Sequence, residues 1–305
     1  MVKIGMVGIG DIAQKAYLPI LGTRSDVELS IATRNREVLM QVGDQYHIEH
    51  RFSTLQDLLA SGIDAAFIHS ATAAHAEMVQ ACIQAGVHVF IDKPIAYHWQ
   101  ETERLVQMAK ERKVGLLVGF NRRFAPMYRS MREALPSPEI VLMQKHRTSP
   151  VSSIRSTIMD DFIHVVDTLI SFVGEPTSYH VHGKIEQGKV HYLVLHLQGA
   201  KSAAIGLMNR HTGVTEERLE VMREGQKQVV HNLTHKTLFE QGTEVHQTAG
   251  DWMPMLERRG FVNMIEHVLN QFSSEVPYAA NLDETLCTHW LCEEIINELE
   301  SKHLS

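Results

Sequence analysis

Residues 2–13 read VKIGMVGIGDIA, a short apolar run followed directly by a glycine-rich turn. The apolar run is typical of a buried parallel strand, which shows no alternation because both of its faces are covered. The turn fits the pattern G-x-G-x-x-G/A: Gly8 permits a tight turn, Gly10 lets the backbone approach a pyrophosphate, and Ala13 lets the next helix pack closely. Unpaired N–H groups at the start of that helix favour an anion. We therefore predict a dinucleotide site at residues 8–13, including Asp11 and Ile12; an ordinary strand-to-helix turn is the alternative.

Further apolar runs alternate with helix-like segments along the first half of the chain. They lie at residues 27–32, 64–69, 87–91 and 114–118, a pattern that predicts a doubly wound α/β fold with a parallel sheet. Ligands of such sheets bind at the carboxyl ends of the strands. The polar loops at those ends are residues 8–13, 33–36, 70–75, 92–94 and 121–124. From them we take further cofactor-binding candidates: Ser70, Thr72, His75, Asp92, Lys93 and Asn121.

The loop after the second strand bears on the choice of cofactor. NAD-binding domains usually carry Asp or Glu there, which accepts a hydrogen bond from the ribose 2′-hydroxyl. This chain has Thr33-Arg34-Asn35-Arg36 instead. A hydroxyl and the planar donor fork of a guanidinium suit a 2′-phosphate, so Thr33 and Arg34 favour NADP(H) over NAD(H). The alternative is a solvated loop arginine.

The tripeptide Asp92-Lys93-Pro94 follows the strand predicted at residues 87–91. A lysine at this sheet edge is placed to polarise a substrate oxygen. The proline restricts the backbone after it and tolerates a cis peptide bond. A surface lysine before a helix is the alternative interpretation of Lys93.

A second group of polar residues falls in the predicted helix around residues 160–171. At 100° per residue, four polar side chains lie within about 60° of one another, namely Asp160, His164, Asp167 and Ser171. A solvated stripe on an amphipathic helix would look similar, but this stripe has no lysine, arginine or glutamate. A carboxylate one turn before a histidine fixes its tautomer and raises its basicity. The pattern favours catalysis by Asp160 and His164.

Composition narrows the class of protein. The chain has 305 residues, 44% of them hydrophobic and 21% charged, which is typical of a soluble globular protein and favours two domains. A net charge of −7 argues against nucleic acid or an anionic membrane as the main partner. We find no apolar run of about 18 residues and no signal-peptide pattern. These features predict a cytoplasmic protein that acts on a small molecule.

The cysteines and histidines do not predict a metal site. The three cysteines, Cys82, Cys287 and Cys292, form no C-x-x-C pair and are expected to be buried free thiols. The 19 histidines include pairs such as His180 and His182, without an accompanying cysteine or carboxylate cluster. Because a metal site needs three or four converging ligands, surface histidines are the favoured interpretation.

Together these motifs resemble the glucose–fructose oxidoreductase/inositol dehydrogenase/MocA (Gfo/Idh/MocA) family of nicotinamide-dependent oxidoreductases. Residues 8–13 match its fingerprint, and Asp92-Lys93-Pro94 matches its Glu-Lys-Pro motif with Asp in the first position. Residues 160–164 match its Asp-x-x-x-His helix, although Phe162 replaces a glycine common there. The stretches at residues 119–126, 145–147 and 257–261 are similar to the bacterial MviM branch. The resemblance covers nearly the whole chain.

The resemblance implies a Rossmann domain over residues 1–120. Residues 121–305 would form an α/β domain with a large, open, mostly antiparallel sheet. Runs at residues 139–147, 178–185, 189–198, 203–210 and 217–223 read as its strands, and residues 260–272 and 283–300 as helices. In the family the outer face of that sheet often forms a dimer interface, so a homodimer or a dimer of dimers is expected.

The resemblance also implies roles for individual residues. His164 would be the general base that takes the hydroxyl proton, Lys93 would stabilise the alkoxide, and Asp160 would orient the proton relay. Arg122 and His146 are further substrate-binding candidates, and sugars, sugar derivatives or polyols are the implied substrates. Two alternatives remain open: a catalytically silent nucleotide-binding regulator or redox sensor on the same fold, and a metal-dependent lyase or isomerase.

Overall fold

The computed structural model describes residues 1–272 and 282–303, which form two compact units. Unit 1 comprises residues 1–119 and 261–283, and unit 2 comprises residues 120–260 and 284–305. The first boundary therefore falls at Gly119, within one residue of the expected position. Among the described residues, 261–272 group with the first unit, although they were expected in the second.

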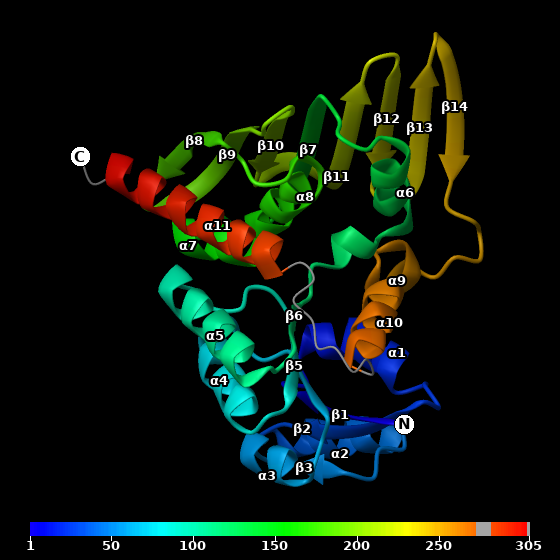
Figure 1. Ribbon diagram of the computed structural model, residues 1–305, viewed down its shortest axis with the longest axis vertical. Coiled ribbons are helices and arrows are strands. Elements are labelled where there is room, and N and C mark those ends of the chain that lie inside the picture. Colours follow the sequence, from blue (N-terminus) through cyan, green and yellow to red (C-terminus); the bar gives the residue numbers. More distant parts are fainter. Residues whose placement is uncertain (273–281, 304–305) are drawn as a thin grey trace. The chain divides into compact units, whose positions relative to one another are not determined.

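Unit 1 is built on a six-stranded parallel sheet, drawn from blue to green in Figure 1. Its strands are β1 (Val2–Val7), β2 (Val27–Ala32), β3 (Arg51–Phe52), β4 (Ala65–Ile68), β5 (His88–Ile91) and β6 (Leu116–Val118). The strand order is β3-β2-β1-β4-β5-β6, and every pair is parallel. The order reverses between β1 and β4, which opens a crevice at their carboxyl ends. The doubly wound parallel sheet is confirmed.

The helices of unit 1 follow the strands in alternation. They are η1 (Ala13–Tyr17), α1 (Leu18–Leu21), α2 (Arg36–Gln45), α3 (Leu55–Ala60), η2 (Thr72–Ala74), α4 (His75–Gln84), α5 (Trp99–Arg112) and α10 (Phe261–Phe272). The helical segment that follows the glycine turn begins as a π-helix over η1. The next turn holds Pro19, which has no N–H to offer the carbonyl of Lys15. The N-cap of α3 is Thr54, whose hydroxyl accepts from Asp57 N.

Helix α10 belongs to unit 1 because its side chains pack on that unit's first helices and strands. The ring of Phe261 meets Tyr17 edge-on with centroids 5.6 Å apart. At the other end of α10, Phe272 stacks on His88 at 5.3 Å. Such contacts join segments far apart in the chain, so no local pattern could assign α10 to the first unit.

Unit 2 contains an eight-stranded sheet in the order β14-β13-β12-β11-β7-β10-β9-β8. Its strands are β7 (Ile140–Thr148), β8 (Ser178–Glu186), β9 (Lys189–Gln198), β10 (Ala203–Asn209), β11 (His211–Arg223), β12 (Gln226–His231), β13 (His235–Glu240) and β14 (Thr243–Thr248). The pair β7–β10 is parallel and the other pairs are antiparallel. The mostly antiparallel sheet is confirmed. The sequence patterns did not predict β12 to β14, the last of which is exposed along its whole length.

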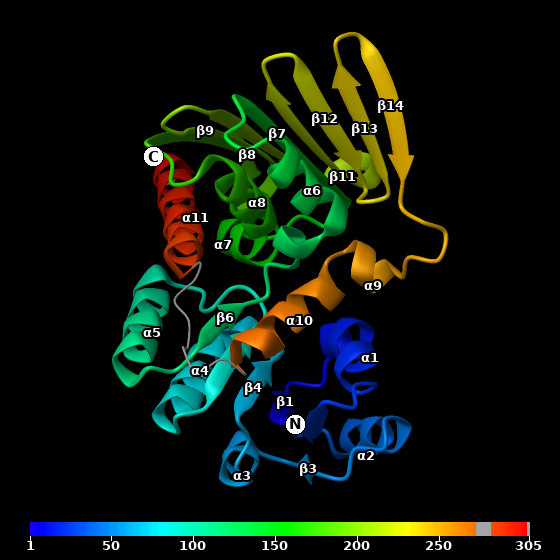
Figure 2. The ribbon, with the colours of Figure 1, turned by 45° about the vertical axis from the view of Figure 1, so that its right-hand side comes forward.

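Helices cover one face of this sheet, and Figure 2 shows α6 and α8 against it. The helices are η3 (Asn121–Phe124), α6 (Pro126–Ala134), α7 (Ile154–Thr157), η4 (Ile158–Phe162), α8 (Ile163–Val173), α9 (Met255–Arg258) and α11 (Leu282–His303). Helix α8 lies close to β10, since a Cβ atom built on Gly206 would come within 2.7 Å of Val165. The neighbours Ile205 and Leu207 therefore point to the opposite, outer face of the sheet.

The segment expected as one continuous α-helix differs from the prediction at its start. Residues 158–162 form the π-helix η4, and the α-helix α8 begins at Ile163. A π turn is wider than an α turn, so the angles assumed for Asp160 and Asp167 do not hold across it. Short π segments are frequent at functional sites.

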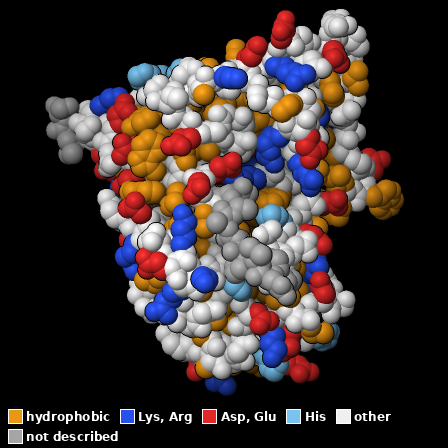
Figure 3. Space-filling view, viewed as in Figure 1, with side chains coloured by type: hydrophobic (Ala, Val, Ile, Leu, Met, Phe, Trp, Pro, Cys, Tyr) orange, Lys and Arg blue, Asp and Glu red, His pale blue; other side chains and the backbone are white. Residues whose placement is uncertain are grey.

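The protein surface mixes charges of both signs. The face drawn in Figure 3 shows red acidic and blue basic side chains interspersed, with hydrophobic side chains between them. In the residues that the structure describes, no helix is long and apolar enough to cross a membrane.

Candidate functional site

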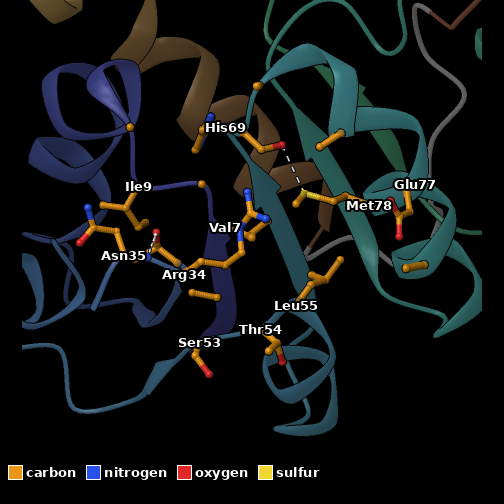
Figure 4. Close-up of a pocket in the computed structure, with 18 of the residues that line it drawn as sticks. Val7, Ile9, Arg34, Asn35, Ser53, Thr54, Leu55, His69, Glu77 and Met78 are labelled. Carbon is orange, nitrogen blue, oxygen red and sulfur yellow. Dashed lines mark hydrogen bonds between the residues drawn. The ribbon is translucent and has the colours of Figure 1, made fainter. Parts of the chain in front are cut away.

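A cavity of about 710 Å³ lies in unit 1 at the carboxyl ends of β1, β2 and β4. It is lined by residues 7–10, 32–35, 53–56 and 69–71, together with Glu77, Met78 and Ala81 of α4. Figure 4 shows Arg34 on one side of this cavity and Glu77 and Met78 on the other. The cavity therefore occupies the crevice that the strand order creates, and the loops predicted from the sequence form its walls.

Only glycine fits at position 8, because of the backbone conformation there and because neighbouring atoms leave no space for a side chain. Its φ is +86°, a conformation that residues with a side chain rarely adopt. A Cβ atom at this position would stand 2.4 Å from the backbone nitrogen of Ser70. The glycine thus lets β1 end against the end of β4, which gives the tight turn expected from the fingerprint.

Gly10 shows the opposite environment, because a Cβ atom built there meets nothing within 4 Å. Its backbone faces the open cavity, in the place where the fingerprint puts a pyrophosphate. The other residues of the turn differ in their exposure to solvent. Ala13 is fully buried, Ile12 is 37% exposed, and Asp11 pairs with Lys15 at 2.7 Å on the surface. A cofactor role for Asp11, Ile12 and Ala13 stays a prediction.

Arg34 has no hydrogen bond or ion pair to any residue that the structure describes. It lines the cavity after β2, and Figure 4 shows its side chain extending across the cavity toward Val7. Asn35 caps α2 by accepting from Val38 N at 3.2 Å, and Thr33 Oγ1 accepts from Asn35 N at 3.3 Å. Arg34 and the N-terminus of α2 thus both border this cavity, and a guanidinium and free N–H groups are donors that suit a phosphate group.

His69 lines the same cavity and was not among the sequence candidates, because it reads as the end of a strand. Its ring stacks on Tyr17 with centroids 3.9 Å apart. Burial, with a smaller effect of the nearby His75, lowers the pKa of His69 to about 3, so the ring is neutral. Neither ring nitrogen has a hydrogen-bond partner among the described residues. Because buried polar atoms are normally paired, a ligand in this cavity would supply the missing partner.

His75 does not line the cavity; it connects the loop at residues 70–75 to the loop at residues 92–94. It is 1% exposed, with Nδ1 2.7 Å from the carbonyl oxygen of Pro94 and Nε2 3.0 Å from that of Ser70. Ser70 lines the cavity and its hydroxyl contacts Met78 Sδ at 3.2 Å. Thr72 lies in η2 outside the lining residues. His75 therefore has a structural part in the site, and the cofactor roles of Thr72 and His75 stay predictions.

Lys93 stands directly after β5, as the sequence predicts, and the Lys93–Pro94 peptide bond is cis. The Lys93 backbone N donates to Asp92 Oδ1 at 2.9 Å. Desolvation raises the pKa of Asp92, while the charge of Lys93 acts to lower it. The two side chains are thus electrostatically coupled at the carboxyl end of β5.

Asp160 and His164 lie in consecutive elements of unit 2. Asp160 is in η4, where its Oδ2 accepts from Ser156 Oγ at 2.9 Å. His164 is in the first turn of α8 and its side chain is partly exposed. Both side chains are therefore partly exposed, whereas their neighbours Phe162 and Val165 are buried in the apolar core.

Asp167 does not belong to the same polar stripe, which corrects the interpretation of residues 160–171. It is 1% exposed and receives two donors of Arg123, with Nη2 2.6 Å from Oδ1. Arg123 also pairs with Glu284 of α11. The pair is structural, because it satisfies a buried carboxylate between α8 and η3.

Arg122, Asn121 and His146 have partners within unit 2. Arg122 Nη2 donates to Glu217 at 2.7 Å, and Tyr128 donates to the same carboxylate. Asn121 Nδ2 donates to the Arg259 carbonyl oxygen, and His146 Nδ1 accepts from Asn209 N. These hydrogen bonds use several polar atoms of the three side chains. The substrate-binding roles of Arg122 and His146 and the cofactor-binding role of Asn121 stay predictions.

Among the residues that the structure describes, no three His, Cys, Asp or Glu side chains come together as metal ligands would. Cys82 and Cys292 are buried, whereas Cys287 is partly exposed.

Comparisons with known proteins agree with this geometry. Residues 2–120 match the family model described as "Oxidoreductase family, NAD-binding Rossmann fold", and residues 126–241 match "YceM-like, C-terminal domain". The protein YceM of Salmonella typhimurium is 35% identical over 275 residues, which cover 88% of each chain.

Two solved structures resemble the whole chain. A Gfo/Idh/MocA family oxidoreductase from Vibrio cholerae has 30% identity and a TM-score of 0.95, with 100% of both chains covered. The dehydrogenase MviM from Clostridium difficile has 30% identity and a TM-score of 0.93, covering 97% of this chain and 99% of the other. The glycine turn, the cavity beside it and the two-unit fold agree with these matches, and the chain belongs to the Gfo/Idh/MocA family of NAD(P)-dependent oxidoreductases.

Proposed function

We propose that this protein transfers a hydride between a nicotinamide cofactor and a hydroxyl or carbonyl carbon of a sugar, a sugar derivative or a polyol. The cavity with Gly8 and Gly10 in its wall carries the cofactor half of this proposal. The substrate half rests on family membership and on the presence of Lys93, Asp160 and His164 at the motif positions.

The bound nicotinamide supplies the hydride chemistry, and the protein supplies placement and proton transfer. In the direction of oxidation, His164 takes the proton of the substrate hydroxyl as general base. The ammonium of Lys93 stabilises the negative charge that develops on that oxygen. Asp160, held by Ser156 Oγ at 2.9 Å, orients the histidine.

NADP(H) is the cofactor that the residues after β2 favour. Arg34 is unpaired within the described chain and lies beside Thr33 in the cavity wall, where an acidic residue would otherwise select NAD(H). One relative agrees: IolU of Bacillus subtilis, a scyllo-inositol 2-dehydrogenase (NADP(+)), is 28% identical over 137 residues, 44% of this chain and 42% of its own.

Replacing Arg34 with alanine is expected to weaken NADP(H) binding by about 1.5–3 kcal/mol, the range for hydrogen bonds to charged groups. NAD(H) binding should hardly change, because NAD(H) lacks the 2′-phosphate. Titration of both cofactors by calorimetry, in the parent and in Arg34→Ala, measures this difference. Arg36→Ala is the matched control, since that arginine lies outside the lining residues. Equal affinities of the parent for both cofactors would contradict the assignment.

A substrate screen tests the activity itself. The purified protein would be incubated with NADP⁺ or NAD⁺ and a panel of polyols, sugars and sugar acids, and reduction followed by nicotinamide absorbance. Turnover of one panel member supports the proposal. Tight cofactor binding without turnover of any member would favour the alternative of a nucleotide-binding regulator.

We also propose that two copies associate through the outer face of the unit 2 sheet. Pairing registers place Val194, Leu207 and Gln144 in one outward row, and His196, Ile205 and Leu142 in the next. Most of these side chains are apolar and only partly covered. Burial of such a surface in a partner copy would contribute favourably, at roughly 25 cal/mol per Å².

Leu207→Arg is expected to convert a dimer to a monomer, because it places a charge in the middle of this face. Light scattering coupled to gel filtration gives the mass of each species. Val245→Arg serves as control, since Val245 is exposed on edge strand β14 and lies on the other face of the sheet. A monomeric parent protein, or a Leu207→Arg variant that keeps its mass, would refute the interface.

A further inference from the structure

Unit 2 collects more positive than negative charge around η3, β7 and α9. Four guanidinium groups lie there with two carboxylates, and each of them acts on one of these carboxylates or on another of the arginines. The guanidinium groups are those of Arg122, Arg147, Arg210 and Arg259, and the carboxylates are those of Asp161 and Glu217. The arginines exceed these carboxylates by two charges, or by one if the neighbouring Asp160 is included, and Lys145, which pairs with Asp161, adds to the positive side.

Asp161 is already neutralised by more than one cation. Lys145 and Arg147 both donate to its carboxylate, and Arg210 Nη1 lies 3.4 Å from Oδ2. Burial acts to raise the pKa of Asp161, but Lys145 and Arg147 outweigh it and hold that pKa well below its usual range. Asp161 therefore cannot compensate all three cations.

Arg147 keeps donor capacity after this pairing. Its Nε and Nη2 reach Asp161, whereas Nη1 has no hydrogen-bond partner among the described residues. The side chain is 38% exposed, compared with 10% for Arg210 and 3% for Lys145. Arg147 is thus the member of this group that an incoming molecule can reach.

Arg259 has an exposed side chain on a backbone that is fixed beside Arg122 through Asn121. Its carbonyl oxygen accepts from Asn121 Nδ2 at 2.8 Å, and the next residue, Gly260, packs so tightly that a Cβ atom would come within 2.2 Å of the Asn121 oxygen. No hydrogen bond or ion pair of its guanidinium involves a described residue. Desolvation, followed by repulsion from Arg122, lowers the pKa of Arg259, and Arg147 adds to the repulsion.

Arg147 and Arg259 repel one another, and each has donors without a partner among the described residues. An anion that contacts both would relieve this repulsion. We propose that Arg147 and Arg259 together bind a negatively charged group of the substrate, a carboxylate or a phosphate. This inference rests on the proposed function and specifies its substrate class: an acidic sugar or polyol derivative rather than a neutral one. The planar donor forks of two arginines match the oxygens of either group.

The probe experiment uses compounds that differ in one group, on protein saturated with NADP(H) so that the cofactor cavity is filled. Sorbitol, gluconate and sorbitol 6-phosphate share a carbon chain and differ in their charged group. Calorimetry should show gluconate or sorbitol 6-phosphate binding at least about tenfold more tightly than sorbitol. Which of the two anions binds better distinguishes a carboxylate from a phosphate site.

Arg259→Gln should reduce the affinity for the anionic probe by about 10- to 100-fold and leave sorbitol unaffected. It removes no hydrogen bond or ion pair within the described chain, so folding is expected to survive. Arg147→Gln should act in the same direction, although it also frees part of Asp161. Arg129→Gln is the control, because that arginine is exposed on α6 and pairs with Glu133 of the same helix.

Equal binding of neutral and anionic probes, or anion binding that Arg259→Gln leaves intact, overturns this inference while the dehydrogenase function stands. Anion binding that depends on Arg259 supports it even if no panel member is turned over, in which case the proposed reaction fails instead. If added salt weakens the binding of the anionic probe but not that of sorbitol, this would further support a site that binds through charge.

Discussion

His164→Ala is expected to lower turnover of an identified substrate by about 10²–10⁴-fold, the usual contribution of a positioned general acid or base. Cofactor affinity should not change, because the lining residues of the cofactor cavity belong to unit 1. Steady-state kinetics give the turnover, and calorimetry gives the cofactor affinity. With a substrate deuterated at the reacting carbon, the proton-transfer defect should be visible as a changed isotope effect.

Two companion variants make this test specific. His180→Ala replaces an exposed histidine of β8 and should leave kinetics unchanged. Lys93→Met removes the charge of the other proposed catalytic residue at similar bulk and should also slow the chemical step while retaining cofactor binding. Recovery of His164→Ala activity by added imidazole would support the base role. Full activity of His164→Ala on the same substrate would show that the histidine is not the base.

Arg123→Met is expected to destabilise unit 2 by about 3–5 kcal/mol, the cost of leaving a buried charge without its partner. Asp167 is 1% exposed, and Arg123 supplies two of its hydrogen bonds. Urea unfolding gives the free energy, and hydrogen exchange of α6 and α8 shows whether the loss lies in this unit. Arg129→Met, on the exposed face of α6, should change stability by less than about 0.5 kcal/mol.

The pH dependence of Arg123→Met follows from the same carboxylate. Burial raises the pKa of Asp167 even with Arg123 present, and removal of the arginine should raise it further. A carboxyl group with a raised folded-state pKa binds more protons in the folded than in the unfolded protein, so stability falls as the pH rises through that range. The deficit of the variant should therefore be smallest in acid and fully present at neutral pH.

A double variant separates charge from volume. Arg123→Met combined with Asp167→Leu removes both charges, and replacement of a buried ion pair by apolar groups is often neutral. Recovery of most of the lost stability in the double variant would support the explanation. An equally unstable double variant would mean that packing, not the unpaired carboxylate, causes the loss.

The parallel sheet was predictable because its evidence is local. An apolar run such as residues 2–7 is buried on both faces, and a glycine turn follows it within two residues. The loops at the strand ends were predictable for a similar reason. Each follows a parallel strand directly in the sequence, so all of them lie at the carboxyl edge of the sheet. In unit 2, strands such as β9 and β10 were also predictable, because buried and more exposed residues alternate along them.

Other features left too weak a local signal. Strand β14 is exposed at every residue, so its sequence shows no buried face. His69 reads as a strand end, and only the packing of Tyr17 against its ring reveals the buried, unpartnered imidazole. The π turn of η4 could not be seen either, because the same residues would also form a regular α-helix.

The sequence by itself determined the family, the nucleotide-binding turn and the catalytic candidates, because each is encoded by neighbouring residues with fixed spacing. The tertiary structure alone decided which charges remain available for a ligand. Arg123 and Arg122 look as accessible in the sequence as Arg259, but they are paired with Asp167 and Glu217. Those partners lie 44 and 95 positions along the chain, and pairing over such distances depends on how the helices pack against the sheet.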